Sequence, residues 1–404
     1  MMVRLRKKTK PNYNFMKIPY SKQTITNQDI SSVVKVLRSD FITQGPTTEL
    51  FEKKISKYCG SKYSISTNSA TSALHIACLS LNVGKKDIVW TSPNSFVASS
   101  NCAIFCGASI DFVDIDSKTY NISITSLEDK LAIAKKKNKL PKVLIVVHFA
   151  GNPCDMEKIF QLSKKYNFKI IEDASHALGT KNKNFKVGSC KYSNISVFSF
   201  HPVKTITTAE GGIATTNSFK IAKLMRLYRT HGITKIKKDF IKKNNDPWFY
   251  EQQLLGFNYR MNDLEGALGI SQLKNVDKWV KKRNYLADIY DKEFSNLPLK
   301  LPLRKKHSLS SVHLYVVKID KNKTNLTRRH VFNKLKSKNI MTNVHYIPIH
   351  MQPYYRKLKF KIGDFPVCEE YYKYALSLPM YPGLKLKEQK KVIEVLKKIF
   401  NKSN

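Results

Sequence analysis

The sequence predicts an α/β protein in which a mostly parallel sheet is covered by helices on both faces. The first observation is the alternation of short apolar, β-rich runs with helical patterns from about residue 63 to residue 216. The second is the length of 404 residues, which favours two domains over one. The third is a change of pattern after about residue 294. We expect a basic, poorly ordered extension over 1–15, a large domain over 16–275 and a small α/β domain over 276–404.

Two helices are expected at the start of the large domain. Residues 27–39 are amphipathic, with Asn27 as the candidate N-cap, and residues 46–60 form a second helix that Gly60 ends. Strand-like runs then cover 63–66, 87–92, 109–114, 143–148, 168–171, 197–200 and 213–216. The helical patterns are an apolar helix ending at Leu81, then 97–106, 127–137, 156–166, 218–228 and a long helix over 264–293.

The C-terminal part has fewer elements. Strands are expected over 313–319 and 342–346. Helices are expected over 328–338, 369–375 and 388–400.

The composition limits the classes of partner. The formal net charge of +41 would favour nucleic acid, but the basic residues are mostly lysines spread along the chain, and no nucleic-acid-binding motif occurs. No apolar run has the length of a membrane-spanning helix. The seven cysteines form no CxxC pair, so we expect buried free thiols, a reducing cytoplasm and no metal site. We therefore expect neither a nucleic-acid partner nor a membrane.

The most informative stretch is SVFSFHPVKTITTAEGGIATT, residues 196–216. Lys204 comes just after a buried strand and before a Gly-Gly turn and a second strand. Burial disfavours the ammonium ion, so such a lysine has a lowered pKa and its amine can act as a nucleophile that forms a Schiff base. In a chain with 71 Lys+Arg residues, the spacing alone leaves a surface lysine as an alternative.

Two other stretches of the chain contain candidate ligand-binding residues. Asp173 stands just past the carboxyl end of the strand 168–171, at the edge of the sheet where ligands gather, and its carboxylate could pair with a protonated ring nitrogen. A strand-end cap or a metal-binding aspartate remains an alternative for Asp173. Ser69, Ala70 and Thr71 stand at a strand-to-helix turn, where free N–H groups can bind a phosphate or where Ser69 is simply an N-cap.

Several motifs, in this order along the chain, resemble the DegT/DnrJ/EryC1/StrS family of sugar aminotransferases, which use pyridoxal 5′-phosphate. They are ISTNSATSALHIA, the run through Pro93–Phe96, IIEDASHALGT, SFHPVKTITTAEGG, LYRTHGI, LLGFNYRMNDLEGALGISQL and NVHYIPIH. The resemblance covers about residues 17–400. The motifs SHALG, FNYRMND and VHYIPIH resemble those of one branch of the family. That branch makes UDP-4-amino-4,6-dideoxy-N-acetyl-β-L-altrosamine on the pathway to pseudaminic acid.

The resemblance implies a fold-type I transferase with a mostly parallel seven-stranded sheet, and it assigns roles to residues. Lys204 would hold the cofactor, and Asp173 would pair with its ring nitrogen. The phosphate would be held by Ser69, Ala70, Thr71, Ser199 and, from a partner subunit of a homodimer, Asn258. Phe96 would stack on the ring, and His176 would contact the side of the cofactor that carries its phenolic oxygen. The substrate candidates are Arg229, His231, Tyr346 and His350. Four of these residues have a plainer alternative: core packing for Phe96 and His176, and a basic helix end for Arg229 and His231.

The reaction implied is transfer of an amino group from L-glutamate to C4 of a UDP-4-keto-6-deoxy sugar. Dehydratase members of the family have histidine in place of Lys204, so its presence argues against them. The alternatives are an aminotransferase that acts at C3 or on a GDP- or dTDP-sugar, a basic nucleic-acid-binding or regulatory protein, and a scaffold without cofactor.

Overall fold

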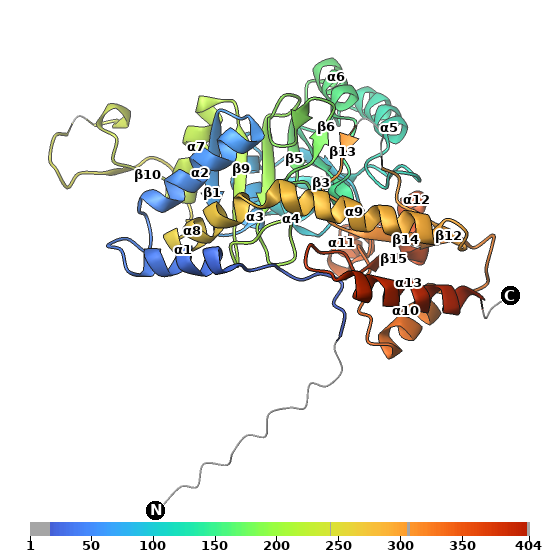
Figure 1. Ribbon diagram of the computed structural model, residues 1–404. Helices are drawn as coiled ribbons and strands as arrows, with labels where there is room; N and C mark the ends of the chain where they lie inside the picture. The colour runs from blue at the N-terminus through green and yellow to red at the C-terminus, as the bar shows by residue number, and fades with distance from the viewer. Residues whose placement is uncertain (1–16, 243, 305–307, 402–404) are drawn as a thin grey trace, which may run out of the picture.

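A computed structural model describes residues 17–242, 244–304 and 308–401. The predicted extension over 1–15 lies outside these residues. At the centre is a seven-stranded sheet with the order β1-β9-β8-β5-β4-β2-β3 (Figure 1). Its strands are β1 (Tyr63–Thr67), β2 (Ile88–Thr91), β3 (Ser109–Phe112), β4 (Val143–Val147), β5 (Lys169–Asp173), β8 (Ile195–Ser199) and β9 (Gly212–Thr216).

The sheet is mostly parallel, as predicted. β3, β2, β4, β5 and β8 pair in parallel, and β9 is antiparallel to both of its neighbours, β8 and β1. Every residue of β4 is buried, which explains its continuous apolar sequence VLIVV. The five parallel strands end at the same edge, so residues that follow them meet there.

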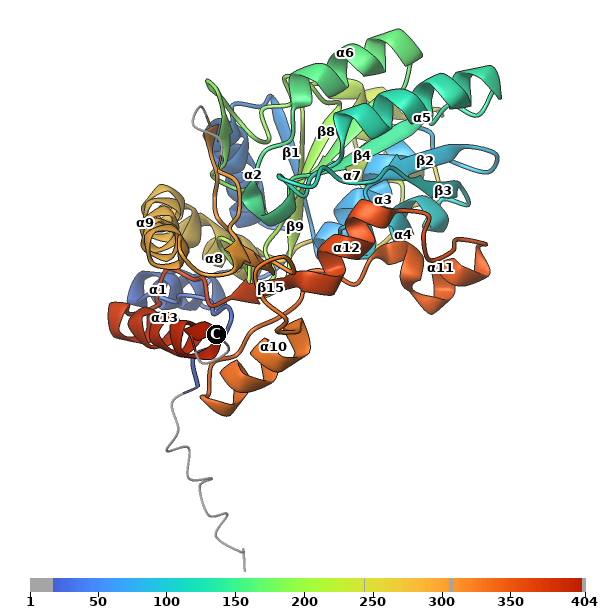
Figure 2. The same cartoon turned by 90° about the vertical axis from the view of Figure 1, so that its right-hand side faces the viewer.

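Helices cover both faces of the sheet because successive side chains along a strand point to opposite faces. Val143 and Ile145 of β4 belong to a core with α3 (Ala70–Ser80), α4 (Ala98–Phe105) and α7 (Phe219–Arg229). Leu144 and Val146 belong to a core with α5 (Ile124–Lys136) and α6 (Met156–Tyr166). Figure 2 shows α5 and α6 side by side along one edge of the molecule. The result is a three-layer α/β/α arrangement.

The N-terminal helices differ from the expectation in one detail. α1 spans Asn27–Leu37 and α2 spans Pro46–Cys59, with Gly60 ending α2 in the left-handed conformation as predicted. Asn27, however, is the first helical residue, and Thr26 is the N-cap. The Thr26 hydroxyl oxygen accepts from the N–H of Asp29, and the Asp29 carboxylate accepts from the N–H of Thr26. The reciprocal pair satisfies two N–H groups, which Asn27 alone would not do.

The predicted long helix over 264–293 is two helices. α8 spans Asp263–Leu273 and α9 spans Val276–Phe294. At the break, the N–H of Lys274 bonds to Ser271 O and that of Asn275 to Gln272 O, which is one tight turn. Asparagine is a weak helix former because its side chain competes for backbone hydrogen bonds. Figure 1 shows α9 running from the sheet to the C-terminal elements.

The C-terminal part contains a second sheet with the order β12-β14-β15. These strands are Leu299–Lys300, Tyr315–Ile319 and Ala375–Leu378, and α10 (Arg328–Ser337), α12 (Pro366–Tyr374) and α13 (Leu386–Asn401) surround them. The strand expected over 342–346 is wrong: Asn343 makes a single antiparallel bridge with Ser377. Strand β15 was not predicted, because its four apolar or small residues directly follow a helical pattern. The domain boundary at residue 275 stays a prediction.

The remaining elements are short. One two-stranded sheet pairs β10 (Ile233–Thr234) with β11 (Glu251–Gln252), and one three-stranded sheet has the order β13 (Ser308–Leu309), β6 (Lys181–Asn182), β7 (Phe185–Lys186). The others are the helix α11 (Pro353–Lys357) and single 3-10 turns at Phe149–Gly151, Lys237–Asp239 and Ile349–Met351. All seven cysteines are free, and six are buried, as predicted. Among the described helices, none is long and apolar enough to cross a membrane.

Candidate active site

A cavity of about 500 Å³ opens at the carboxyl edge of the central sheet. It lies where β4, β5 and β8 end, next to the start of α3 and the residues that lead into α4. Segments from the C-terminal part close its other side. The lining residues are Tyr20, Ser69, Ala70, Thr71, Leu74, Ser95, Phe96, Ala98, Val147, Asp173, Ser175, His176, Ser199, His201, Val203, Lys204, Glu210, His313, Asn343, Val344, His345 and Tyr346.

Lys204 lies in the loop that joins β8 to β9. Its N–H bonds to His201 O at 2.9 Å, which forms a turn directly after the strand. Burial lowers the pKa of the Lys204 amine from 10.5 to about 8, although the nearby Asp173 carboxylate acts in the opposite direction. The amine is therefore far more often neutral near pH 7 than a solvated lysine would be.

Asp173 is the last residue of β5 and is buried. Its backbone is paired with Val147 on one side and Val197 on the other. The carboxylate accepts hydrogen bonds from the Ser99 hydroxyl at 2.6 Å and from the N–H of Ser175 at 3.1 Å. The side chain is thus fixed at the bottom of the cavity by groups on both sides.

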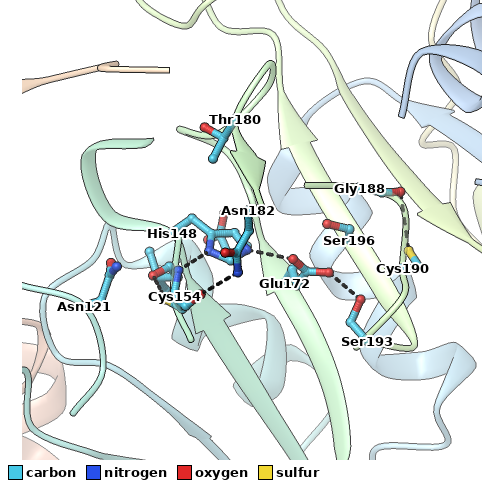
Figure 3. A network of polar contacts seen from close by, with 12 residues as sticks. Asn121, His148, Cys154, Glu172, Thr180, Asn182, Gly188, Cys190, Ser193 and Ser196 are labelled. Carbon is cyan, nitrogen blue, oxygen red and sulfur yellow. Dashed lines mark hydrogen bonds and ion pairs between the residues drawn. The ribbon is translucent and has the colours of Figure 1, made fainter. Parts of the chain in front are cut away.

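Behind this strand end lies a second buried network, shown in Figure 3. Glu172 precedes Asp173 and points to the opposite face of the sheet, where its carboxylate contacts His148 Nε2 at 2.7 Å and the Ser193 hydroxyl at 2.5 Å. His148 Nδ1 accepts from the N–H of Cys154 at 3.1 Å, so Nε2 carries the proton. The N–H of His148 in turn donates to Asp173 O at 3.1 Å. These bonds anchor the end of β5 to that of β4.

The first turn of α3 faces the cavity. Ser69 is the N-cap and accepts from the N–H of Ser72 at 3.1 Å. The N–H groups of Ala70 and Thr71 precede the first helical hydrogen bond and are available to an anion. Gly212 packs so close that a Cβ there would lie 2.4 Å from Ala70 N. The glycine therefore lets β9 approach this helix end.

His176 and Tyr346 form one wall of the cavity. The N–H of Ala150 donates to His176 Nδ1 at 3.2 Å, so Nε2 carries the proton and faces the Tyr346 hydroxyl at 3.1 Å. The His313 ring lies 4.4 Å from that of His176, measured between centroids. Burial and the Lys204 charge lower the pKa of His176 well below 6.5, so its ring is neutral.

Two more predicted residues line the cavity. Phe96 is 59% exposed, with its ring centroid 6.4 Å from that of Tyr346, so it is not a core residue. Ser199 ends β8, and its hydroxyl oxygen accepts from the N–H of His201 at 3.4 Å. An open aromatic face suits stacking on a flat ring.

Four predicted residues lie outside the lining of this cavity. Arg229 pairs with Glu52 at 2.5 Å and donates to Ser66 O at 3.0 Å. His350 is buried and contacts Glu369 at 2.9 Å. His231 is exposed after α7, and Asn258 makes a bridge with Thr230. The structure does not bring these four to the residues around Lys204 within one chain.

Sequence reasoning missed several lining residues. Ser95 lies in a run whose phenylalanine alone was singled out, and its four-residue spacing from the buried Ser99 at a helix start was the available signal. His313, His345 and Glu210 carried no local signal, because their place depends on how the C-terminal part and the loop after Lys204 fold onto the sheet. Among the described residues, no group of three or more His, Cys, Asp or Glu is placed to hold a metal ion.

Comparison with known proteins gives a match over nearly the whole chain. Residues 23–397 match the model of the DegT/DnrJ/EryC1/StrS aminotransferase family. The UDP-4-amino-4,6-dideoxy-N-acetyl-beta-L-altrosamine transaminase of Campylobacter jejuni is 37% identical over 388 residues, which are 95% of this chain and 98% of that protein.

Two solved structures are also similar. Helicobacter pylori PseC, an aminotransferase involved in the biosynthesis of pseudoaminic acid, has a TM-score of 0.86 and 32% identity, with 96% of this chain and 100% of that one covered. The putative sugar aminotransferase Spr1654 of Streptococcus pneumoniae, in its PLP-form, has a TM-score of 0.85 and 28% identity, with the same coverage.

Proposed function

This chain belongs to the DegT/DnrJ/EryC1/StrS aminotransferase family, and on that premise we propose that it moves an amino group from L-glutamate to C4 of a UDP-4-keto-6-deoxy-N-acetylhexosamine. The product would be UDP-4-amino-4,6-dideoxy-N-acetyl-β-L-altrosamine, as named for the C. jejuni and H. pylori relatives. The observation that carries the proposal is the convergence of Lys204, Asp173 and the first turn of α3 on one cavity.

The residues of the cavity fit pyridoxal 5′-phosphate. A lysine with a lowered pKa, a buried carboxylate, an open aromatic face and a helix N-terminus each match one part of that molecule. Lys204 would hold it through Nζ. The phosphate would lie at Ser69, Ala70 and Thr71, with Ser199 nearby. When bound, the cofactor accepts the amino group and serves as an electron sink for the carbon that loses a proton.

Lys204 supplies the acid–base chemistry in this proposal. Its Nζ takes the proton from the α-carbon of the amino donor and later returns a proton to the carbon that receives the amine. A general base works best when its pKa is near the working pH, and a pKa of about 8 meets that condition. Asp173 would pair with a positive ring nitrogen by charge, Phe96 would stack on the ring, and the neutral His176 would contact the side of the ring that carries the phenolic oxygen.

The sugar nucleotide would enter along the wall that carries Tyr346. The proposal includes a homodimer in which Asn258 of one subunit reaches the cofactor phosphate of the other, since Asn258 lies outside the cavity of its own chain. The buried, unpaired cysteines fit a reducing cytoplasm.

The test of the reaction is spectroscopic. Purified protein with pyridoxal phosphate should show a visible absorption band that L-glutamate removes, and Lys204→Ala should lack it. The UDP-4-keto sugar should then restore the band and yield a 4-amino sugar by mass spectrometry. Absence of any band after incubation with the cofactor would refute the proposal. Restoration by a 3-keto sugar, or by a dTDP- or GDP-sugar only, would move the protein to another branch of the family.

The test of the shared site is complementation. Lys204→Ala and Asn258→Ala are each expected to be impaired, because every site of either dimer has one defect. In a mixed dimer both defects fall in one site and the other site is intact. Co-expression should therefore give back activity in about a quarter of all sites if subunits mix at random. If the mixture stays at the level of the single variants, Asn258 does not act across an interface.

A further inference from the structure

Two serines that have no role in the proposed function form a chain of hydrogen bonds that ends on the carboxylate of Asp173. The Ser99 Oγ lies 2.6 Å from Asp173 Oδ2, and the Ser95 Oγ lies 2.7 Å from the Ser99 Oγ. Both serines are buried, Ser99 completely. Ser95 also lines the cavity, whereas Ser99 lies behind it.

The direction of both bonds follows from the donors available. An ionised carboxylate only accepts hydrogen bonds, so the single O–H of Ser99 points to Asp173. Ser99 then has no proton left for Ser95, and the O–H of Ser95 must point to Ser99. The 2.6 Å separation is that of a charge-assisted O–H···O⁻ bond. The order of donation is therefore Ser95 to Ser99 to Asp173.

The backbone holds this chain in place. Ser99 is in the first turn of α4, and its N–H bonds to Phe96 O at 3.2 Å. The same short segment thus presents the Phe96 ring to the cavity and the Ser99 hydroxyl to the carboxylate. On the other side, the N–H of Ser175 occupies a lone pair of Asp173 Oδ1. The lone pairs that remain on the carboxylate have a fixed direction.

We propose that Ser95 and Ser99 are positioning residues that keep the Asp173 carboxylate charged and aimed at the ring nitrogen of the cofactor. This inference rests on the proposed function. Hydrogen bonds to a carboxylate favour its charged form, and in a dry site each bond in a chain strengthens the next. Without them, the proton shared by the carboxylate and the ring nitrogen moves toward the carboxylate, and the ring loses positive charge.

The experiment compares the holoenzyme with Ser99→Ala, Ser95→Ala and the control Ser100→Ala. Ser100 is the next residue of the same helix, fully buried, and its hydroxyl contacts Tyr355 Oη at 2.5 Å instead of Asp173. Two quantities are measured: the pH midpoint of the visible band of the bound cofactor, and the dissociation constant of pyridoxal phosphate. Thermal unfolding shows that each variant is folded.

We expect the midpoint of Ser99→Ala to rise by about one pH unit and its cofactor affinity to fall about tenfold, equivalent to about 1.4 kcal/mol. The midpoint rises because a less positive ring repels the proton on the Lys204 nitrogen less. Ser95→Ala should shift in the same direction by less, and Ser100→Ala should not shift. Ser95→Ala also keeps the test open if Ser99→Ala does not fold.

Equal shifts in Ser99→Ala and Ser100→Ala, or no shift in Ser99→Ala and Ser95→Ala, would overturn the positioning role. Both results would leave the proposed function standing, because the wild-type band would be present. If the wild-type protein shows no visible band of the bound cofactor, the proposed function itself is refuted.

Discussion

The lowered pKa of Lys204 can be measured in the native apoprotein. The perturbation is pH, and the readout is the extent to which a trace amount of an acylating reagent labels Lys204 between about pH 6 and 11, followed by mass spectrometry of its peptide. Only the neutral amine reacts. Labelling of Lys204 should therefore rise with a midpoint near pH 8 in the native protein and near 10.5 after denaturation.

The size of the effect follows from the two pKa values. At about pH 7.5, a pKa of 8 leaves about a quarter of the amines neutral, whereas a pKa of 10.5 leaves about one in a thousand. The native site should thus be labelled a few hundred times faster than its amine would be in the unfolded chain. Burial is the main cause, so denaturation should abolish the difference.

Asp173→Asn separates the two causes. The carboxylate of Asp173 raises the pKa of Lys204 against the effect of burial. Removing this charge should move the labelling midpoint of Lys204 below pH 8. A native midpoint near 10.5, or an upward shift in Asp173→Asn, would refute the assignment of Lys204 as a buried amine beside that carboxylate.

The same shift predicts the pH dependence of stability. Between about pH 8 and 10.5 the unfolded chain keeps the proton of Lys204 while the folded chain has lost it. The unfolded state then binds more protons, so the contribution of this residue to the free energy of unfolding rises with pH across the window. Lys204→Met should remove that part of the slope in chemical denaturation of the apoprotein. An unchanged slope would contradict the sign.

Three substitutions test the surroundings of the site. Gly212→Ala should cost about 1–3 kcal/mol in chemical denaturation and weaken cofactor binding, because its Cβ would lie 2.4 Å from Ala70 N; an unaltered affinity would show that this close approach is unimportant. Arg229→Met should cost about 3–5 kcal/mol by leaving the buried Glu52 carboxylate without its cation, with KM for the sugar nucleotide unchanged, whereas a raised KM at full stability would support substrate binding by Arg229. Phe96→Ala should change the free energy of unfolding by about 0.5 kcal/mol or less but weaken cofactor binding in a fluorescence titration, since the ring is largely exposed; a large loss of stability would make it a core residue.

The central sheet was predictable because its strands are buried on both faces. Such strands are continuous apolar runs, and each of the seven predicted runs coincides with a strand to within a few residues. Lys204 and Asp173 follow from the same property, since each sits where a buried run stops. Their place at one edge of the sheet then depends only on the strands being parallel.

The C-terminal part was less predictable because its short strands depend on tertiary pairing. The residues over 342–346 include a β-branched pair typical of strands, yet only Asn343 finds a partner, Ser377. The partner strand β15 follows α12 without a break in composition, so no local signal separated them. The break between α8 and α9 was likewise a single turn at Lys274 and Asn275.

Arg229 shows why a charge at the end of a helix does not by itself identify a ligand site. A basic residue in the last turn of α7 is equally suited to a substrate phosphate and to a buried carboxylate. The choice depends on Glu52, which is remote in sequence and is brought close because α2 packs on β1. The sequence distance between the two partners leaves no local pattern to detect.

The position of Arg229, paired with Glu52 outside the cavity, also bears on how a sugar nucleotide would be bound. Among the described residues that line the cavity, Lys204 is the only lysine or arginine, and it is engaged with the cofactor in the proposed reaction. In the same proposal the first turn of α3 is engaged with the cofactor phosphate. The charge of a nucleoside diphosphate must then be met by groups that one chain does not bring to this cavity. That requirement supports the proposed homodimer independently of Asn258, because a second subunit can supply cations to a site whose own wall has none to spare.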